Sequence, residues 1–194
     1  MSRQKPDDVE ILSEERLLTA FINVDRVTFR HETFAGPMSN PVERQIYRTR
    51  QACAVLVWDK TIERLILIRQ FRIQAHMTGE GWVIEIAAGM LDDGEDPRDA
   101  AVREVAEETG YAVSALEPIT TCLTAPGVIT ERVHIYYAEV DGRAAISTGL
   151  DEEGEDIETL SLTPDEARAM MASGEICDAK TIIALQWWLM RHRR

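Results

Sequence analysis

The sequence predicts an α+β fold. Short runs rich in β-branched and aromatic residues recur along the chain, and two or three other segments carry clear helix start and stop residues. These runs show no regular alternation of strand, helix and strand, and that irregular order indicates α+β. The chain has 194 residues, 45% of them hydrophobic, which is enough for one well-packed core and a small additional unit.

The N-terminal part predicts a small β unit. Residues 1–16 are polar and charged, and we expect them to fray. Residues 17–34 show apolar and aromatic side chains in rough alternation, which predicts strands, and the Gly-, Pro- and Asn-rich stretch 36–41 interrupts them. We therefore expect an N-terminal β unit at residues 1–45 and a main domain at residues 46–194.

Six further runs predict the strands of the main domain. The first two are separated only by Asp-Lys-Thr-Ile-Glu and should form an antiparallel pair, and the third enters a glycine-containing turn. The expected strands are 52–59, 64–72, 81–89, 118–125, 132–140 and 157–162.

Three helices are expected. The first is capped by Asp96, begins at Pro97 and stops at Gly110. The second repeats these devices and adds a capping box, through Thr163, Pro164, Glu166 and Gly174. The third runs from about residue 178 to 193, with one apolar face formed by Ile182, Leu185, Trp188 and Leu189.

Composition excludes several function classes. The formal net charge of −13 opposes binding to nucleic acid, and the one dense basic run, at 191–194, is interpreted as a solvated helix end. No apolar run reaches the roughly 20 residues that span a bilayer, and the N-terminus has no secretory apolar region. We expect a cytoplasmic protein with no membrane partner.

The cysteines and histidines predict no zinc site. Cys53, Cys122 and Cys177 are far apart and odd in number, which is typical of reduced thiols, and the four histidines are scattered. The acidic excess does suit divalent cations.

One segment, Arg-Glu-Val-Ala-Glu-Glu-Thr-Gly at 103–110, raises a question of charge. On a helix, Glu104 and Glu108 share one face and Glu107 lies three positions from Glu104. Like charges at this spacing destabilise a helix by roughly 0.2–0.5 kcal/mol per pair. Either solvent screens these carboxylates on an outer face, or a cation lies among them.

The wider segment 89–111 resembles the Nudix box. Gly89, Glu95, the Arg103-Glu104 pair, an aliphatic residue, the following Glu-Glu pair and a glycine all have the spacing of that motif, and only Tyr111 departs from its usual aliphatic residue. The resemblance implies a Nudix fold, with a mixed β-sheet sandwiched between helices. Its members hydrolyse a nucleoside diphosphate linked to another moiety.

The resemblance also implies a metal site. Glu104 and Glu108 would be primary ligands, with the backbone carbonyl of Ala88 and a shared contribution from Glu107. Arg103 would support the site by pairing with Glu107 four residues away. The expected ion is Mg²⁺, with Mn²⁺ also possible, since hard cations take oxygen ligands.

Similarity beyond the box, over residues 45–190, is closest to the nucleoside-diphosphate-sugar pyrophosphatases. It implies that Arg72 contacts the substrate diphosphate and that Glu85 accepts hydrogen bonds from a base or sugar. For Arg72 the alternative is a surface salt bridge, and for Glu85 it is a structural role. Pro126 and Gly127 resemble the Pro-Gly segment of ADP-ribose pyrophosphatases.

The acidic stretch 150–158 resembles the loop that supplies the general base in these enzymes. Glu153 matches that position and Glu155 is the fallback, whereas a solvated loop is the alternative interpretation. Metal binding lowers the pKa of the attacking water, so this carboxylate needs only to orient it.

The resulting hypothesis is hydrolysis of ADP-ribose to AMP and ribose 5-phosphate. GDP-mannose is the nearest alternative substrate, and a non-catalytic nucleotide-sugar sensor or an enzyme for oxidised nucleoside triphosphates are the other classes. The resemblance further implies a homodimer, with residues 17–45 and 178–193 near the interface. Base preference, the number of ions and the phosphorus attacked stay open.

Overall fold

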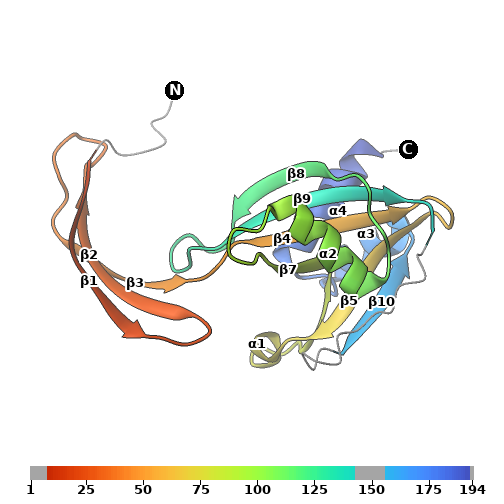
Figure 1. Ribbon diagram of the computed structural model, residues 1–194, viewed down its shortest axis with the longest axis horizontal. Helices are drawn as coiled ribbons and strands as arrows, with labels where there is room; N and C mark the ends of the chain where they lie inside the picture. The colour runs from red at the N-terminus through yellow and green to blue at the C-terminus, as the bar shows by residue number, and fades with distance from the viewer. Residues whose placement is uncertain (1–7, 143–155, 193–194) are drawn as a thin grey trace. The chain divides into compact units, whose positions relative to one another are not determined.

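The computed structural model describes residues 8–142 and 156–192, and the chain divides into two compact units (Figure 1). The first unit combines the N-terminal residues up to Arg50 with the loop segment 123–131. The second unit contains the remaining described residues, which include all the helices. Within the described residues, no helix combines the length and the apolar character needed to cross a bilayer.

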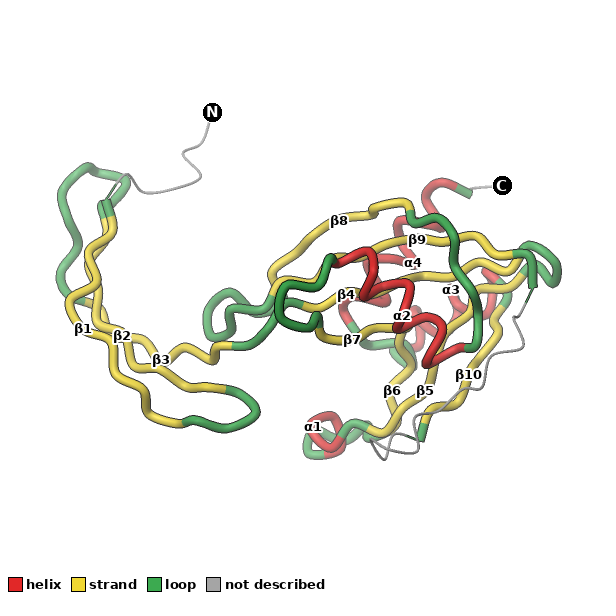
Figure 2. Tube along the Cα trace, viewed as in Figure 1, coloured by secondary structure: helices red, strands yellow, loops and turns green. Residues whose placement is uncertain are grey.

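The first unit is a three-stranded antiparallel sheet in the order β1-β2-β3 (Figure 2). Its strands are β1 (Val9–Leu18), β2 (Asn23–His31) and β3 (Val42–Arg48). The expectation that the first sixteen residues fray was therefore wrong for most of β1. Loop 123–131 joins this unit by backbone hydrogen bonds to Tyr47, whose N–H donates to Val128 O at 2.8 Å.

Cross-strand ion pairs explain why the polar N-terminal segment forms a strand. Arg26 donates to Glu15 at 2.9 Å, and Arg30 pairs with Glu10 in the same way. Opposite charges that face each other across two strands each stabilise a sheet by roughly 0.2–1 kcal/mol. The charged side chains that led us to expect fraying thus form ion pairs between strands.

The second unit contains a seven-stranded mixed sheet, in which β10, β5, β4, β9 and β8 lie in that order. Strands β4 and β9 are parallel, and the pairs that β5 forms with β4, β6 and β10 are antiparallel. The bounds are β4 (Ala52–Asp59), β5 (Arg64–Phe71), β6 (Trp82–Glu85), β7 (Ala87–Met90), β8 (Glu117–Leu123), β9 (Arg132–Val140) and β10 (Ile157–Leu162).

Helices cover both faces of this sheet, which confirms the predicted sandwich (Figure 1). Helix α2 (Pro97–Thr109) packs on one face, and α3 (Pro164–Ser173) and α4 (Ala179–Arg191) pack on the other. Alternate residues of β4 enter the two cores, as expected for a strand buried on both sides. The caps and glycine stops predicted for α2 and α3 are confirmed.

The run expected as one strand at 81–89 is instead two. Strand β6 pairs with β5, whereas β7 pairs with β4, so the chain changes partners at Ile86. The Ile86 N–H leaves the ladder and donates to Thr181 Oγ1 at 2.9 Å, a contact that periodicity does not reveal. The short helix α1 (Ile73–His76) between β5 and β6 was also not expected.

Candidate active site

Helix α2 presents the carboxylates of the box from a well-defined start and end. Asp96 caps it by accepting from Arg98 N at 2.8 Å, and Gly110 ends it in the left-handed conformation, with φ of 70°. Its apolar residues Ala100, Ala101 and Val105 are fully buried against the sheet. Burial of these apolar residues orients the polar side chains between them toward the loop that precedes α2.

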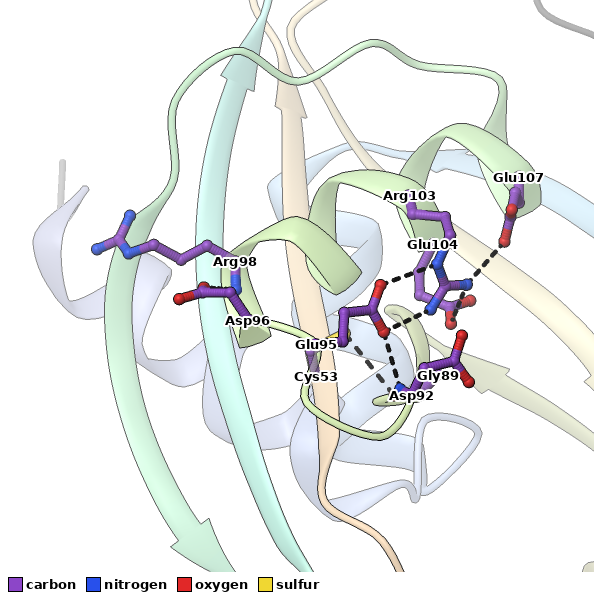
Figure 3. A network of polar contacts seen from close by, with 9 residues as sticks. All are labelled: Cys53, Gly89, Asp92, Glu95, Asp96, Arg98, Arg103, Glu104 and Glu107. Carbon is purple, nitrogen blue, oxygen red and sulfur yellow. Dashed lines mark hydrogen bonds and ion pairs between the residues drawn. The ribbon is translucent and has the colours of Figure 1, made fainter.

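Arg103 lies at the centre of the carboxylates (Figure 3). Its Nη1 donates to Glu104 Oε1 at 2.8 Å and to Glu107 Oε2 at 3.0 Å, so the expected pairing of Arg103 with Glu107 is present. Its Nε and Nη2 each donate to a different oxygen of Glu95, both at 3.2 Å. Such a planar fork matches a carboxylate and fixes its orientation.

Glu95 connects the loop before α2 to the helix through hydrogen bonds. Besides the two bonds from Arg103, Glu95 accepts from Asp92 N at 2.9 Å (Figure 3). The hydrogen bonds from Arg103 and then from Asp92 lower the pKa of Glu95, and the bonds with Glu95 raise the pKa of Arg103. Both groups are therefore charged at neutral pH.

Two carboxylates of α2 touch strand β7. Glu104 is 12% exposed and lies against Gly89, where an added Cβ would come within 1.9 Å of Glu104 Oε1. Glu108 is 6% exposed and accepts from Ala88 N at 2.9 Å. The structure thus brings together Ala88, Gly89, Glu104 and Glu108, which are distant in sequence.

The chemistry of this donor set fits a hard divalent cation. Carboxylate and carbonyl oxygens are the ligands that Mg²⁺ takes in proteins, and a glycine at position 89 leaves the space that a side chain would fill. Among the described residues, no three His, Cys, Asp or Glu side chains already converge on one point. Arg103 supplies the positive charge among the carboxylates.

Arg72 and Glu85 form an ion pair with each other. Arg72 Nη2 donates to Glu85 Oε2 at 2.9 Å, and Arg72 Nε to Glu85 Oε1 at 3.4 Å. Lys180, at the start of α4, lies 3.3 Å from the same Oε2. Sequence reasoning missed Lys180, although a cation in the first turn of a helix is an unusual position that calls for an explanation.

A pocket of about 500 Å³ lies beside Arg72. Its lining is mixed, with aromatic, amide and charged side chains from Gln70, Phe71, Arg72, Ile73, Gln74, Trp82 and Asp156. Trp82 is half-exposed and meets Phe71 edge to face, with ring centroids 5.6 Å apart. The pocket therefore offers both a cation and aromatic surface to a ligand.

Four predicted site residues lie outside the second unit as the structure describes it. Pro126 and Gly127 belong to the first unit, in the exposed loop between β8 and β9. Glu153 and Glu155 lie outside the described residues.

Tyr111, the one departure from the box, is buried as expected. Its hydroxyl donates to Asp59 Oδ2 at 3.0 Å, and Asp59 also accepts from Thr61 N and Oγ1. Burial raises the pKa of Asp59, but the bonds from Thr61 and Tyr111 outweigh it and lower the pKa overall. The tyrosine thus replaces an aliphatic side chain without leaving a buried polar atom unpaired.

Comparison with known proteins agrees with the fold. Residues 48–183 match the family model described as the NUDIX domain, and the chain therefore belongs to the Nudix family of hydrolases. Hydrolases of this family generally use a divalent metal ion.

Proteins similar in sequence include pyrophosphatases. The chain is 38% identical to an ADP-ribose pyrophosphatase of Escherichia coli strain K12 over 189 residues, which cover 96% of this chain and 90% of that protein. It is 33% identical to a GDP-mannose pyrophosphatase of Cronobacter sakazakii, with 95% and 96% coverage. A crystal structure of an ADP compounds hydrolase shares the fold, with a TM-score of 0.75, 22% identity and 99% and 100% coverage.

Proposed function

We propose that this Nudix hydrolase splits the pyrophosphate bond of a nucleoside diphosphate sugar, and that ADP-ribose is its substrate. The observation that carries the proposal is the 38% identity with ADP-ribose pyrophosphatases across 96% of the chain. Water adds across the P–O–P bridge, so that one phosphorus gains a hydroxyl and the other keeps the bridging oxygen. The products are AMP and ribose 5-phosphate.

The metal ion of this proposal is Mg²⁺, with Mn²⁺ as a substitute. Glu104, Glu108, Glu107 and the Ala88 carbonyl would hold it, since Glu104 and Glu108 already lie against β7. When bound, the ion neutralises phosphate charge and lowers the pKa of water. Arg103 holds Glu104 and Glu107 of this set through one hydrogen bond each, and it holds Glu95 of the preceding loop through two more.

Arg72 binds the diphosphate in this proposal, because a guanidinium fork matches phosphate oxygens and Arg72 lines the pocket. In the structure Arg72 is paired with Glu85, and in this proposal Glu85 also accepts hydrogen bonds from the base or sugar of the substrate. Glu153, with Glu155 as the alternative, would orient the attacking water from the segment outside the described residues. Pro126 and Gly127 would contribute to the substrate site.

A panel of nucleotide sugars tests this proposal. With Mg²⁺ present, released phosphomonoester is measured for ADP-ribose, GDP-mannose and other members, and ADP-ribose should give the largest kcat/KM. Glu108→Gln should lower turnover by orders of magnitude, whereas Glu117→Gln on β8 is the matched control and should not. If no nucleotide sugar is hydrolysed, the proposal fails.

GDP-mannose is the second candidate substrate, favoured by the 33% identity with a GDP-mannose pyrophosphatase over nearly the whole of both chains. A higher kcat/KM for GDP-mannose than for ADP-ribose would establish it. A non-catalytic sensor is distinguished by Glu108→Gln, because a sensor keeps its affinity for the nucleotide sugar and shows no turnover before or after the change.

We further propose a cytoplasmic homodimer in which the unit at residues 1–45 joins two copies and completes the pocket. A small sheet needs a hydrophobic face that is covered, and this unit exposes several large apolar side chains: Val9, Ile11, Leu12, Leu18, Phe21 and Phe34. Cys53, Cys122 and Cys177 form no disulfide in the structure, which suits a reducing compartment. Light scattering at micromolar concentration should give twice the chain mass, and a monomer would contradict the proposal.

A further inference from the structure

Lys180 occupies a position that helix energetics disfavour. It lies in the first turn of α4, two residues after the capping Asp178, where the helix dipole opposes a positive charge. Its ammonium is nevertheless held, because Nζ lies 3.3 Å from Glu85 Oε2 and 3.1 Å from Asp178 Oδ1. Only 18% of the side chain is exposed. A lysine in such a place is explained by its partners and not by the helix.

Glu85 is the more buried partner, with 5% exposure, and it faces two cations from different elements. Arg72 follows β5, and Lys180 comes from α4. Burial raises the pKa of Glu85, but the charges of Lys180 and Arg72 and their hydrogen bonds lower it overall. Glu85 is therefore an ionised carboxylate inside the protein.

Lys180 is not needed to attach α4 to the sheet. Asp178 already caps the helix by accepting from Thr181 N at 3.0 Å, and Thr181 Oγ1 already accepts from Ile86 N at 2.9 Å. These neutral and charge-assisted bonds fix the first turn of α4 beside β6 and β7. The contact of Lys180 with Glu85 adds a charge to the site and is separate from this attachment.

Arg72 has two roles that compete for the same N–H groups. Its Nη2 and Nε now point to Glu85, and in the proposed function the same fork points to the substrate diphosphate. A buried carboxylate left without a cation is strongly unfavourable. If Arg72 were the only partner of Glu85, that penalty would oppose the transfer of Arg72 to the substrate.

We propose that Lys180 is a positioning residue that stays on Glu85 while Arg72 exchanges its hydrogen bonds from Glu85 to the substrate diphosphate. The inference rests on the proposed function, because it takes a diphosphate as the group that Arg72 binds. Lys180 does not touch the substrate in this scheme. It keeps the Glu85 carboxylate paired, so that Arg72 is available.

Substitutions of Lys180 test the scheme by separating KM from kcat. Lys180→Met should raise the KM for ADP-ribose about tenfold or more, with kcat near the wild-type value, because Glu85 then retains Arg72. Lys180→Arg should restore most of the affinity. Lys180→Met combined with Glu85→Gln should also restore it, since the neutral amide needs no cation. Lys60→Met is the control, because Lys60 pairs with Asp141 at 3.1 Å on the surface.

A binding measurement makes the test independent of turnover. Calorimetric titration with inorganic pyrophosphate in the presence of EDTA should show weaker binding to the Lys180→Met variant than to the wild type. Equal affinity, or no binding to the wild type, would overturn the inference. An unchanged KM in a Lys180→Met variant that unfolds at the wild-type temperature would also overturn it. If the variant binds pyrophosphate more weakly than the wild type but the enzyme hydrolyses no nucleotide sugar, only the proposed substrate class is rejected.

Discussion

The carboxylate of Glu104 lies over the α-carbon of Gly89, so that a Cβ at position 89 would come within 1.9 Å of Glu104 Oε1. This contact joins the middle of helix α2 to strand β7. Heavy atoms of a real side chain do not approach so closely, and Glu104 therefore depends on the absence of a side chain at position 89. The φ of Gly89 is not in the left-handed region, so the backbone conformation does not require a glycine there. The close approach of Glu104 does.

Gly89→Ala should displace Glu104 and lower kcat with ADP-ribose by about 100-fold or more, since a misplaced ligating group impairs catalysis strongly. Activity as a function of Mg²⁺ concentration measures the effect, and the half-saturating concentration should rise. Adding Glu104→Asp to Gly89→Ala shortens the displaced side chain and should recover part of the activity. An alanine variant with wild-type Mg²⁺ dependence would contradict this role of Gly89.

Arg103→Lys should destabilise the protein, because a lysine cannot replace a fork that reaches three carboxylates. The expected loss is only about 1–2 kcal/mol, because partial exposure weakens each hydrogen bond. The change is measured by urea denaturation in EDTA. Arg168→Lys, at an exposed pair with Asp165 on α3, is the matched control and should change stability by less than about 0.5 kcal/mol. Equal effects of the two substitutions would show that the fork has no special role.

Asp25 should make stability fall in acid. In the folded chain, hydrogen bonds from Arg16 and then Arg48 lower the pKa of Asp25 below its ordinary 3.8. The unfolded chain therefore binds this proton at a higher pH than the folded chain does. The stabilisation is fully present above the unfolded pKa, and it is lost as the pH falls through the lower folded pKa.

Urea midpoints measured from pH 7 down to pH 3 check this expectation. Asp25→Asn should be less stable than the wild type at pH 7, and the difference should narrow below about pH 4. Parallel curves for the two proteins would contradict a role for Asp25 in the acid sensitivity.

Tyr111→Phe should destabilise the protein by about 1–2 kcal/mol, because it removes one hydrogen bond to the buried Asp59 carboxylate and puts no donor in its place. Thermal unfolding measures the loss. Tyr47→Phe, at a 41% exposed position, is the control. A Tyr111 variant no less stable than this control would mean that Thr61 and the backbone of Ile62 satisfy Asp59 without the tyrosine.

Local signals in the sequence predicted the helices and the box well. The caps at Asp96 and Thr163 and the stops at Gly110 and Gly174 act within one turn of the chain, so their neighbours alone define them. The pairing of Arg103 with Glu107 follows from helical spacing in the same way.

Features that depend on distant partners were missed. Residues 1–16 were expected to fray because the residues that pair with β1, such as Arg26 and Arg30, belong to another strand. The break at Ile86 follows from the hydrogen bond to Thr181, far along the chain. Lys180 belongs to no sequence motif, because its role depends on its contact with Glu85.

The parallel pairing of β4 with β9 has a consequence for biosynthesis. Ala52 aligns with Val133 and Asp59 with Val140, so the box and helix α2 lie within the long connection between these two strands. As the chain leaves the ribosome, α2 emerges well before the strand that completes the centre of the sheet. The core against which α2 packs includes Tyr136, Ala138 and Val140 of β9, so it is incomplete until that strand is made. A nascent chain halted before Arg132 should therefore be sensitive to proteases in this region.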